Sequence, residues 1–206
     1  MSLDVVVVPL KSFASAKQRL REGGIEHVSE LAERLAIGVL RACAPRHVIV
    51  LSNSDDATTF ARANGVGVWT SDHPGLNNAV QGSYQALGSQ YDRFIVVHGD
   101  LVAPDGLGAF EPGPGATIVA DHHGQGTNVL VLPTGLDFTF GYGPSSAHHH
   151  QREAQRLGLD WQLLTDSPWQ FDIDEPADLD RARKAFEGAK GPLKSQFPEG
   201  NIETTS

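Results

Sequence analysis

The chain has 206 residues, a formal net charge of −9 and a sequence pI near 5.4. This length suits one domain with a sizeable core, and the acidic balance excludes the extended basic surface with which proteins bind nucleic acids. Any phosphate-bearing partner should therefore be a small molecule held by a few cations. The single cysteine, Cys43, lies in an apolar helical pattern and has no second cysteine to pair with, which indicates a core position in a reducing compartment.

Neither a membrane span nor a signal peptide is indicated. The four valines at residues 5–8 are too few for either, and Asp4 precedes them where a signal peptide would have basic residues. We therefore expect a soluble, cytoplasmic protein without a membrane partner. Residues 188–206 are polar, contain Gly and Pro, and have no hydrophobic period, so we expect them to be a flexible tail behind one folded domain of residues 1–187.

Apolar runs alternate with helical periods in the first half of the chain. We expect helices that begin at the N-cap Ser29, at residue 54 and at residue 75. Strands are expected at residues 3–8, 47–51 and 67–70, and from residue 93 to the Gly99-Asp100 break. Four such alternations predict a mostly parallel sheet with right-handed crossovers. The expected fold is α/β, a Rossmann-like three-layer α/β/α sandwich.

The second half departs from this alternation. Residues 116–120 and 127–132 read as two strands of a β-hairpin, which we expect to form an antiparallel edge extending over the rim of the site. Later elements are expected as a helix at 147–157, a strand at 160–164 and a helix from residue 176 to about 186.

Three aspartates follow buried or extended segments. Asp100 ends the buried strand that begins at residue 93, at the sheet edge where α/β folds bind ligands, and it could hold a hard cation such as Mg²⁺. From this stretch alone, a cap of the following turn is an equally good account. Asp172 and Asp174 should face one side of an extended segment while Ile173 packs inward, so one of them could meet Asp100 across a cation.

Cations cluster directly after the first strand. Lys11, Lys17 and Arg19 lie within nine positions, where an α/β fold places its first phosphate-binding loop. The sequence has no G-x-G-x-x-G and no Walker motif, which argues against a dinucleotide dehydrogenase or a P-loop enzyme.

Two further segments present backbone N–H groups at expected helix N-termini, at residues 75–79 and 140–146. Asn77, in the first of them, could be a plain cap or a ligand for a base or ribose. The histidines at 148–150 point about 100° apart on a helix, so they cannot all bind one metal ion.

Six motifs occur in order from residue 5 to residue 179: V-P-L-K-x₅-K-x-R-L, G-L-N-x-A, H-G-D-L, G-T-N-x-L, Y-G-P-x-S-x₃-H and D-I-D-x-P-x-D-L. Together they resemble the 2-phospho-L-lactate guanylyltransferase family, whose members make the guanylylated precursor of coenzyme F420; a bacterial branch uses phosphoenolpyruvate. The resemblance implies a GT-A-like nucleotidyltransferase domain in residues 1–187. It also implies transfer of GMP from GTP to a small phospho-acid with release of pyrophosphate, and Mg²⁺ as cofactor. The sequence leaves open whether the chain forms a homodimer.

The resemblance also implies the role of each site residue. The catalytic set is Lys11, Lys17, Arg19, Asp100 and Asp172, of which Asp100 and Asp172 would bind Mg²⁺. The nucleotide-binding set is Pro9, Leu10, Lys11, Lys17, Asn77 and His98. The acceptor-binding set is Thr127, Asn128, Gly143, Ser146 and His150.

Three residues depart from the family pattern: this chain has Val102 where the family usually has proline, Ser145 in place of a glycine and Glu175 in place of a common threonine. Ser145 would lie in the acceptor pocket, so the acid that the enzyme uses stays open: phosphoenolpyruvate, phospholactate or phosphoglycerate.

Two alternative functions are weaker. A molybdenum-cofactor nucleotidyltransferase would carry a G-G-x-S-x-R-M first loop, which the sequence lacks, and a non-catalytic nucleotide-binding domain would tolerate loss of a metal acid, whereas both acids are present.

Overall fold

A computed structural model describes residues 3–187 of the chain, and side chains within its last helix as far as residue 182. Seven strands form one sheet in the order β3-β2-β1-β4-β6-β5-β7. Their bounds are β1 (Asp4–Pro9), β2 (His47–Leu51), β3 (Gly67–Trp69), β4 (Arg93–Val97), β5 (Ala116–Ala120), β6 (Thr127–Pro133) and β7 (Trp161–Leu164). β6 is antiparallel to both of its neighbours and every other pair is parallel, which confirms the mostly parallel α/β sheet.

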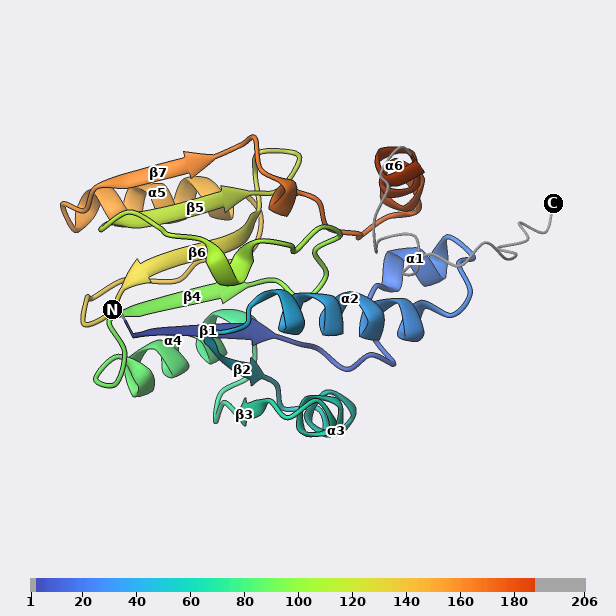
Figure 1. Cartoon of the computed structure of the whole chain (residues 1–206), viewed down its shortest axis with the longest axis horizontal. Helices are drawn as coiled ribbons and strands as arrows, with labels where there is room; N and C mark the ends of the chain where they lie inside the picture. The colour runs from blue at the N-terminus through green and yellow to red at the C-terminus, as the bar shows by residue number, and fades with distance from the viewer. Residues whose placement is uncertain (1–2, 188–206) are drawn as a thin grey trace.

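Helices cover both faces of this sheet (Figure 1). The helices are α1 (Gln18–Glu22), α2 (Val28–Ala42), α3 (Asp55–Ala63), α4 (Leu76–Leu87), α5 (Ser146–Arg156) and α6 (Pro176–Glu187), with the short 3₁₀ helices η1 (Leu107–Ala109) and η2 (Pro168–Gln170). Val5 and Val7 of β1 pack in one apolar cluster with α4 and α5, while Val6 and Val8 pack with α2 and α3. This alternation follows from the two-residue period of a strand, and it confirms the three-layer prediction.

The hairpin of β5 and β6 forms as predicted, but its predicted position at the edge of the sheet is wrong. β6 lies between β4 and β5, and β7 is the edge strand, parallel to β5. The reason is burial on both faces: all five residues of β5 and the first six of β6 are buried. Strands without an exposed polar face need cover on both faces, and the helix layers provide that cover toward the middle of the sheet.

The N-cap prediction for α2 is also wrong. The helix begins at Val28 with His27 as its N-cap. The Ser29 hydroxyl instead donates to the carbonyl of Phe13 (3.0 Å) and accepts from the guanidinium of Arg21 (2.8 Å). These bonds tie α2 to the loop after β1, which contains α1, a short helix that the sequence pattern did not indicate.

A third apolar cluster lies beyond the carboxyl ends of the strands, where α1 and α6 are drawn at the right of Figure 1. Leu20 of α1, Leu35 of α2 and Leu179 of α6 pack there around Ile173. The cluster fixes the segment between η2 and α6, which carries two of the candidate acids.

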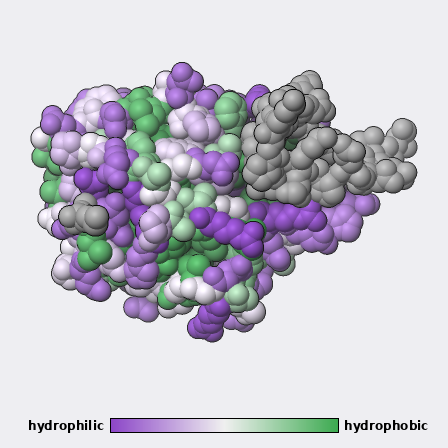
Figure 2. Space-filling view, in the orientation of Figure 1, coloured by the Kyte–Doolittle hydropathy of each residue, from purple (hydrophilic) through white to green (hydrophobic). Residues whose placement is uncertain are grey.

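Cys43 is buried in the core, and burial raises the pKa of its thiol to about 12, which confirms the predicted core position. On the face drawn in Figure 2, hydrophilic and hydrophobic residues are intermixed. No helix within residues 3–187 is long and apolar enough to cross a membrane. The tail expected at residues 188–206 lies outside the described residues, and the assignment of residues 1–187 to one domain stays a prediction.

Candidate active site

A cleft of about 1150 Å³ opens at the carboxyl ends of β1, β2 and β4. Its walls are the loop after β1, the turn between β5 and β6, and the loop that leads into α5. The cleft brings together most of the predicted site residues, namely Pro9, Leu10, Lys11, Lys17, Arg19, His98, Asp100, Thr127, Asn128, Gly143, Ser146 and Asp172.

The three aspartates meet at the floor of this cleft. Asp100, Asp172 and Asp174 each have a carboxylate oxygen within 4.8 Å of the others. Leu101 forms an antiparallel bridge with Asp172, which places the acid after β4 beside the segment before α6. Ile173 is fully buried, so its two acidic neighbours face the same side as predicted.

This cluster fits a hard divalent cation. One oxygen of Asp100, Oδ1, is buried without a hydrogen-bond partner among the described residues, and carboxylate oxygens are ligands that Mg²⁺ prefers. Lys17, in the left-handed conformation with φ 57°, donates from Nζ to Asp100 and to Asp174 (2.8 Å). Burial alone would lower the pKa of Lys17, but the two carboxylates outweigh it and raise that pKa.

The pKa values of Asp100 and Asp172 are shifted in opposite directions. Burial favours the neutral form of Asp100, yet Lys17 and then His98 hold the pKa of this carboxyl below its usual value. Burial, followed by repulsion from Asp100 and Asp174, raises the pKa of Asp172 to about 7. The Asn128 amide donates to Asp172 at 3.5 Å and offsets part of this rise.

The first prediction concerns pH. A proton held by Asp172 must leave before a cation binds, so the affinity for Mg²⁺ should increase as pH rises through about 7. The sign for folding is opposite: native Asp172 binds its proton more tightly than the unfolded chain, so its contribution to metal-free stability is lost as pH rises from about 4 to 7. Calorimetric titration with Mg²⁺ at about pH 6 and about pH 8 checks the binding effect, and equal affinities would contradict it.

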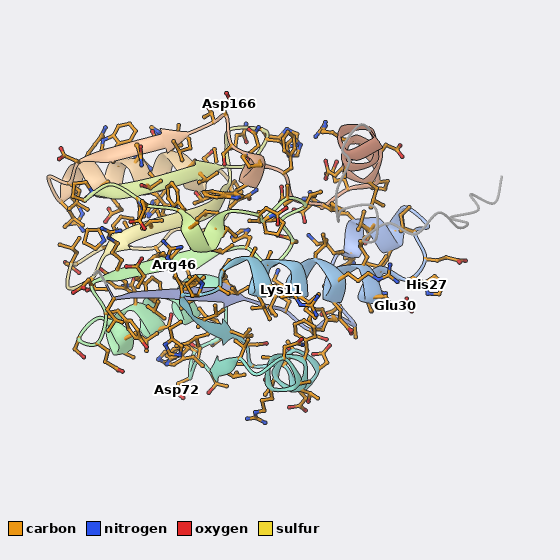
Figure 3. The ribbon with its side chains drawn as sticks, viewed as in Figure 1. Lys11, His27, Glu30, Arg46, Asp72 and Asp166 are labelled. Atoms are coloured by element: carbon orange, nitrogen blue, oxygen red, sulfur yellow. The ribbon has the colours of Figure 1, made fainter. Side chains whose placement is uncertain are left out.

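The other two cations lie nearer the rim. Lys11 is exposed and follows the carboxyl end of β1, as its label in Figure 3 shows. Arg19 donates to Glu175 at 3.0 Å, and both side chains are more than half exposed. Glu175, one of the three departures from the family pattern, therefore pairs with a predicted phosphate-binding residue. An exposed pair contributes little to stability, so Arg19 can exchange Glu175 for another anion at little cost.

The opposite wall of the cleft carries hydroxyl groups. Thr127, the first residue of β6, and Ser146, the first residue of α5, are both buried, and the Ser146 hydroxyl lies 3.2 Å from that of Thr127. Gly143 has φ 138°, a conformation that favours glycine, and its carbonyl accepts from the Ser146 N–H at 3.2 Å. This turn sets the hydroxyl pair at the N-terminus of α5, where an anion is favoured.

Two predicted residues are not in the lining of the cleft. The Asn77 amide accepts from the N–H of Tyr142 (2.6 Å) and donates to its carbonyl (3.1 Å), so it clamps the loop before α5. His150 is completely buried, and both ring nitrogens bond inside the protein, to Thr127 and to Gly141. The motifs single out Asn77 and His150, but these side chains bond to other parts of the protein and do not line the cleft.

Two residues near the acids were missed or undervalued. Asp174 was weighed as an alternative to Asp172, whereas the structure places both in the cluster. His122, in the turn between β5 and β6, lies 3.9 Å from Asp172 and 3.6 Å from Asp178. Asp178 accepts the N–H groups of Asp174 and Glu175 and thereby stabilises the start of α6. Nothing in the local sequence shows that the hairpin turn reaches α6.

Ser145 supports a second prediction. It adopts φ 60°, in the left-handed region, which costs a non-glycine residue about 1–2 kcal/mol. Ser145→Gly removes this cost, but glycine loses more backbone entropy on folding, which costs about 0.5–1 kcal/mol. The free energy of unfolding should therefore rise by roughly 0.5 kcal/mol. Urea denaturation measures the change. Ser145→Ala keeps the strain and serves as the control; a Gly variant less stable than the Ala variant would contradict the account.

A mostly parallel sheet that carries a cation-rich first loop and an acidic cluster at its carboxyl edge suits nucleotidyl transfer, and the family match makes the protein a nucleotidyltransferase. The chain belongs to the family described as guanylyl transferase CofC like, whose model matches residues 4–183. The predicted family, fold and enzyme class are thereby confirmed.

Curated relatives span most of the chain. The chain is 33% identical over 181 residues, 84% of each chain, to a protein named phosphoenolpyruvate guanylyltransferase from Roseiflexus castenholzii. It is 28% identical over 169 residues to a 3-phospho-D-glycerate guanylyltransferase from Phenylobacterium zucineum, covering 77% of this chain and 73% of the relative. A solved nucleotidyl transferase from Methanothermobacter thermautotroptrophicus has the same fold, with a TM-score of 0.61 at 15% identity over 90% of this chain and 98% of its own.

Proposed function

We propose that this protein transfers the GMP moiety of GTP to the phosphate of a small phospho-acid and releases pyrophosphate. One observation carries the proposal: a single cleft joins the Asp100, Asp172 and Asp174 cluster to the Thr127 and Ser146 hydroxyls. Its volume of about 1150 Å³ is enough for a nucleotide and a small acid together. The relatives named as guanylyltransferases act, by their names, on phosphoenolpyruvate and on 3-phospho-D-glycerate.

The chemistry follows from the charges. An oxygen of the acceptor phosphate forms a bond to the α-phosphorus of GTP, the bond from that phosphorus to the bridging oxygen breaks, and pyrophosphate leaves with the electron pair. A phosphate monoester is already anionic near pH 7, so the reaction needs no general base. Lys17, Lys11 and Arg19 would hold the triphosphate and stabilise the charge of the transition state. Mg²⁺ bound by the three aspartates would supply further charge neutralisation.

The hydroxyl wall suits the acceptor. Thr127, Ser146 and the N-terminus of α5 offer donors to a carboxylate or phosphate, and Pro9, Leu10 and His98 line the cleft on the side proposed for the nucleotide. Ser145 also lines the cleft and adds its side chain beside Ser146. The acid set therefore includes phosphoenolpyruvate, 2-phospho-L-lactate and 3-phosphoglycerate.

The family resemblance further supports a place in coenzyme F420 biosynthesis. We also propose a cytoplasmic location, and a homodimer is the assembly to test by light scattering.

An acid panel tests the proposal. Purified protein is mixed with GTP, Mg²⁺ and one phospho-acid at a time, and pyrophosphate release is followed with a coupled assay; ATP, CTP and UTP replace GTP in parallel. We expect GTP with one of the three acids to give the highest kcat/KM. Release of pyrophosphate at the same rate without any acid would contradict acceptor transfer, and a preference for another nucleotide would contradict guanylyl transfer.

A further inference from the structure

His150 of α5 is buried completely and has a bond at each ring nitrogen. Nε2 lies 3.3 Å from the backbone nitrogen of Gly141, and Nδ1 lies 3.0 Å from the hydroxyl oxygen of Thr127. No ring nitrogen remains to touch a substrate. If His150 affects the acceptor site, it must do so through Thr127.

The first of these bonds fixes the tautomer of His150. A backbone N–H can only donate, so Nε2 must be the unprotonated nitrogen that accepts from Gly141. The neutral ring then carries its proton on Nδ1 and donates it to the Thr127 oxygen. Burial, followed by the nearby His149 and His98, lowers the pKa of His150 to about 3, so the ring stays neutral under ordinary conditions.

The second bond decides what Thr127 can offer the cleft. Its hydroxyl has one proton and two lone pairs. One lone pair accepts from His150 and the other accepts from the Ser146 hydroxyl at 3.2 Å. The Thr127 proton is then the free group, and it has no acceptor among the described residues, while Thr127 itself lines the cleft. The opposite His150 tautomer would take that proton and leave lone pairs, which repel an anion.

We propose that His150 is a positioning residue whose tautomer, set by the Gly141 N–H, makes Thr127 a hydrogen-bond donor toward the anionic acceptor. The inference rests on the proposed function, since it assigns the hydroxyl wall to a phospho-acid. His150 then acts on the acceptor through the Thr127 hydroxyl and not by touching it.

The surroundings keep this arrangement rigid. The Tyr142 and Phe138 rings pack on His150 with centroids 4.9 Å and 5.9 Å away. A side chain at Gly141 would overlap the His149 ring, so glycine lets the loop lie against α5 without displacing that ring. The loop before α5 is also clamped by Asn77 at Tyr142.

Two nearly isosteric variants separate donor loss from packing loss. His150→Asn places an amide N–H near the position of Nδ1, whereas His150→Leu has no donor. The KM for the acid should rise by roughly tenfold or more in the Leu variant and stay within about threefold in the Asn variant, as expected for one hydrogen bond to a charged partner. The KM for GTP should change in neither. His148→Leu, on the exposed side of the same helix, is the matched control.

Equal losses in the Asn and Leu variants, or a rise in the KM for GTP, would overturn the proposal. A second measurement needs no turnover and remains decisive if the Leu variant does not fold. Long-range ¹H–¹⁵N NMR of the wild-type histidines should show one neutral ring protonated on Nδ1, assigned to His150 by its absence in the Asn variant. A ring protonated on Nε2 would refute the inference even if guanylyl transfer is confirmed, whereas absent turnover with the expected tautomer would refute only the function.

Discussion

Asp100→Asn is expected to reduce kcat by roughly a thousandfold, because several kcal/mol of charge stabilisation depend on a bound cation that loses one of its charged ligands. Asn keeps the shape of the side chain, so the fold should persist, although the bond from Lys17 weakens. The measurement is pyrophosphate release under saturating GTP, acid and Mg²⁺, with the unfolding temperature as a check on folding.

The same assay ranks the other two acids. Asp172 is 13% exposed and Asp174 is 56% exposed, so Asp172→Asn should approach the loss of Asp100→Asn while Asp174→Asn should lose less. Asp166→Asn is the control, since Asp166 is exposed and is labelled beyond β7, outside the cleft lining, in Figure 3. Wild-type turnover in Asp100→Asn would refute the metal assignment, and equal losses at Asp172 and Asp174 would refute the ranking.

Lys17→Met should abolish guanylyl transfer and should lower the free energy of unfolding in the absence of metal. The variant leaves Asp100, Asp172 and Asp174 close together without their ammonium partner. Lys17 is nearly buried but its two carboxylate partners are partly exposed, so its removal should cost less than the about 3–5 kcal/mol of a fully buried ion pair. The cost should increase as pH rises through about 7 and Asp172 loses its proton.

Mg²⁺ should restore much of the stability of Lys17→Met, because a cation bound by the three acids replaces the missing charge, but it should not restore transfer. Thermal unfolding with EDTA and with excess Mg²⁺ measures this rescue. Lys11→Met, which removes an exposed lysine without an ion-pair partner among the described salt bridges, should unfold like the wild type in both conditions. If Lys17→Met unfolds at the same temperature with excess Mg²⁺ as with EDTA, the three acids do not share a cation.

Local patterns predicted most of the elements because burial leaves a direct record in the sequence. Strands buried on both faces read as unbroken apolar runs, and Ile173 between two acids read as an inward residue between two outward ones. The position of Asp100 after β4 also followed from strand direction alone. These inferences needed no knowledge of distant contacts.

The remaining features depend on contacts between distant segments. Nothing local distinguishes a hairpin at the edge of a sheet from one whose strand β6 inserts beside β4. Asn77 and His150 stood at family positions, but their bonds to Tyr142 and Gly141 arise where two helices, α4 and α5, meet the loop before α5. A motif indicates that a side chain matters, and the fold decides which atoms it contacts.

A ³¹P NMR time course of the protein with GTP, Mg²⁺ and the acid that the panel selects distinguishes guanylyl transfer from hydrolysis of GTP. If the enzyme transfers GMP, the signals of GTP and of the phosphate monoester decrease together. Pyrophosphate and one new diphosphate, in which the guanylyl phosphorus is joined to the acid's phosphate, then increase at equal rates. Orthophosphate and GDP as the products, with the acid unchanged, would contradict guanylyl transfer.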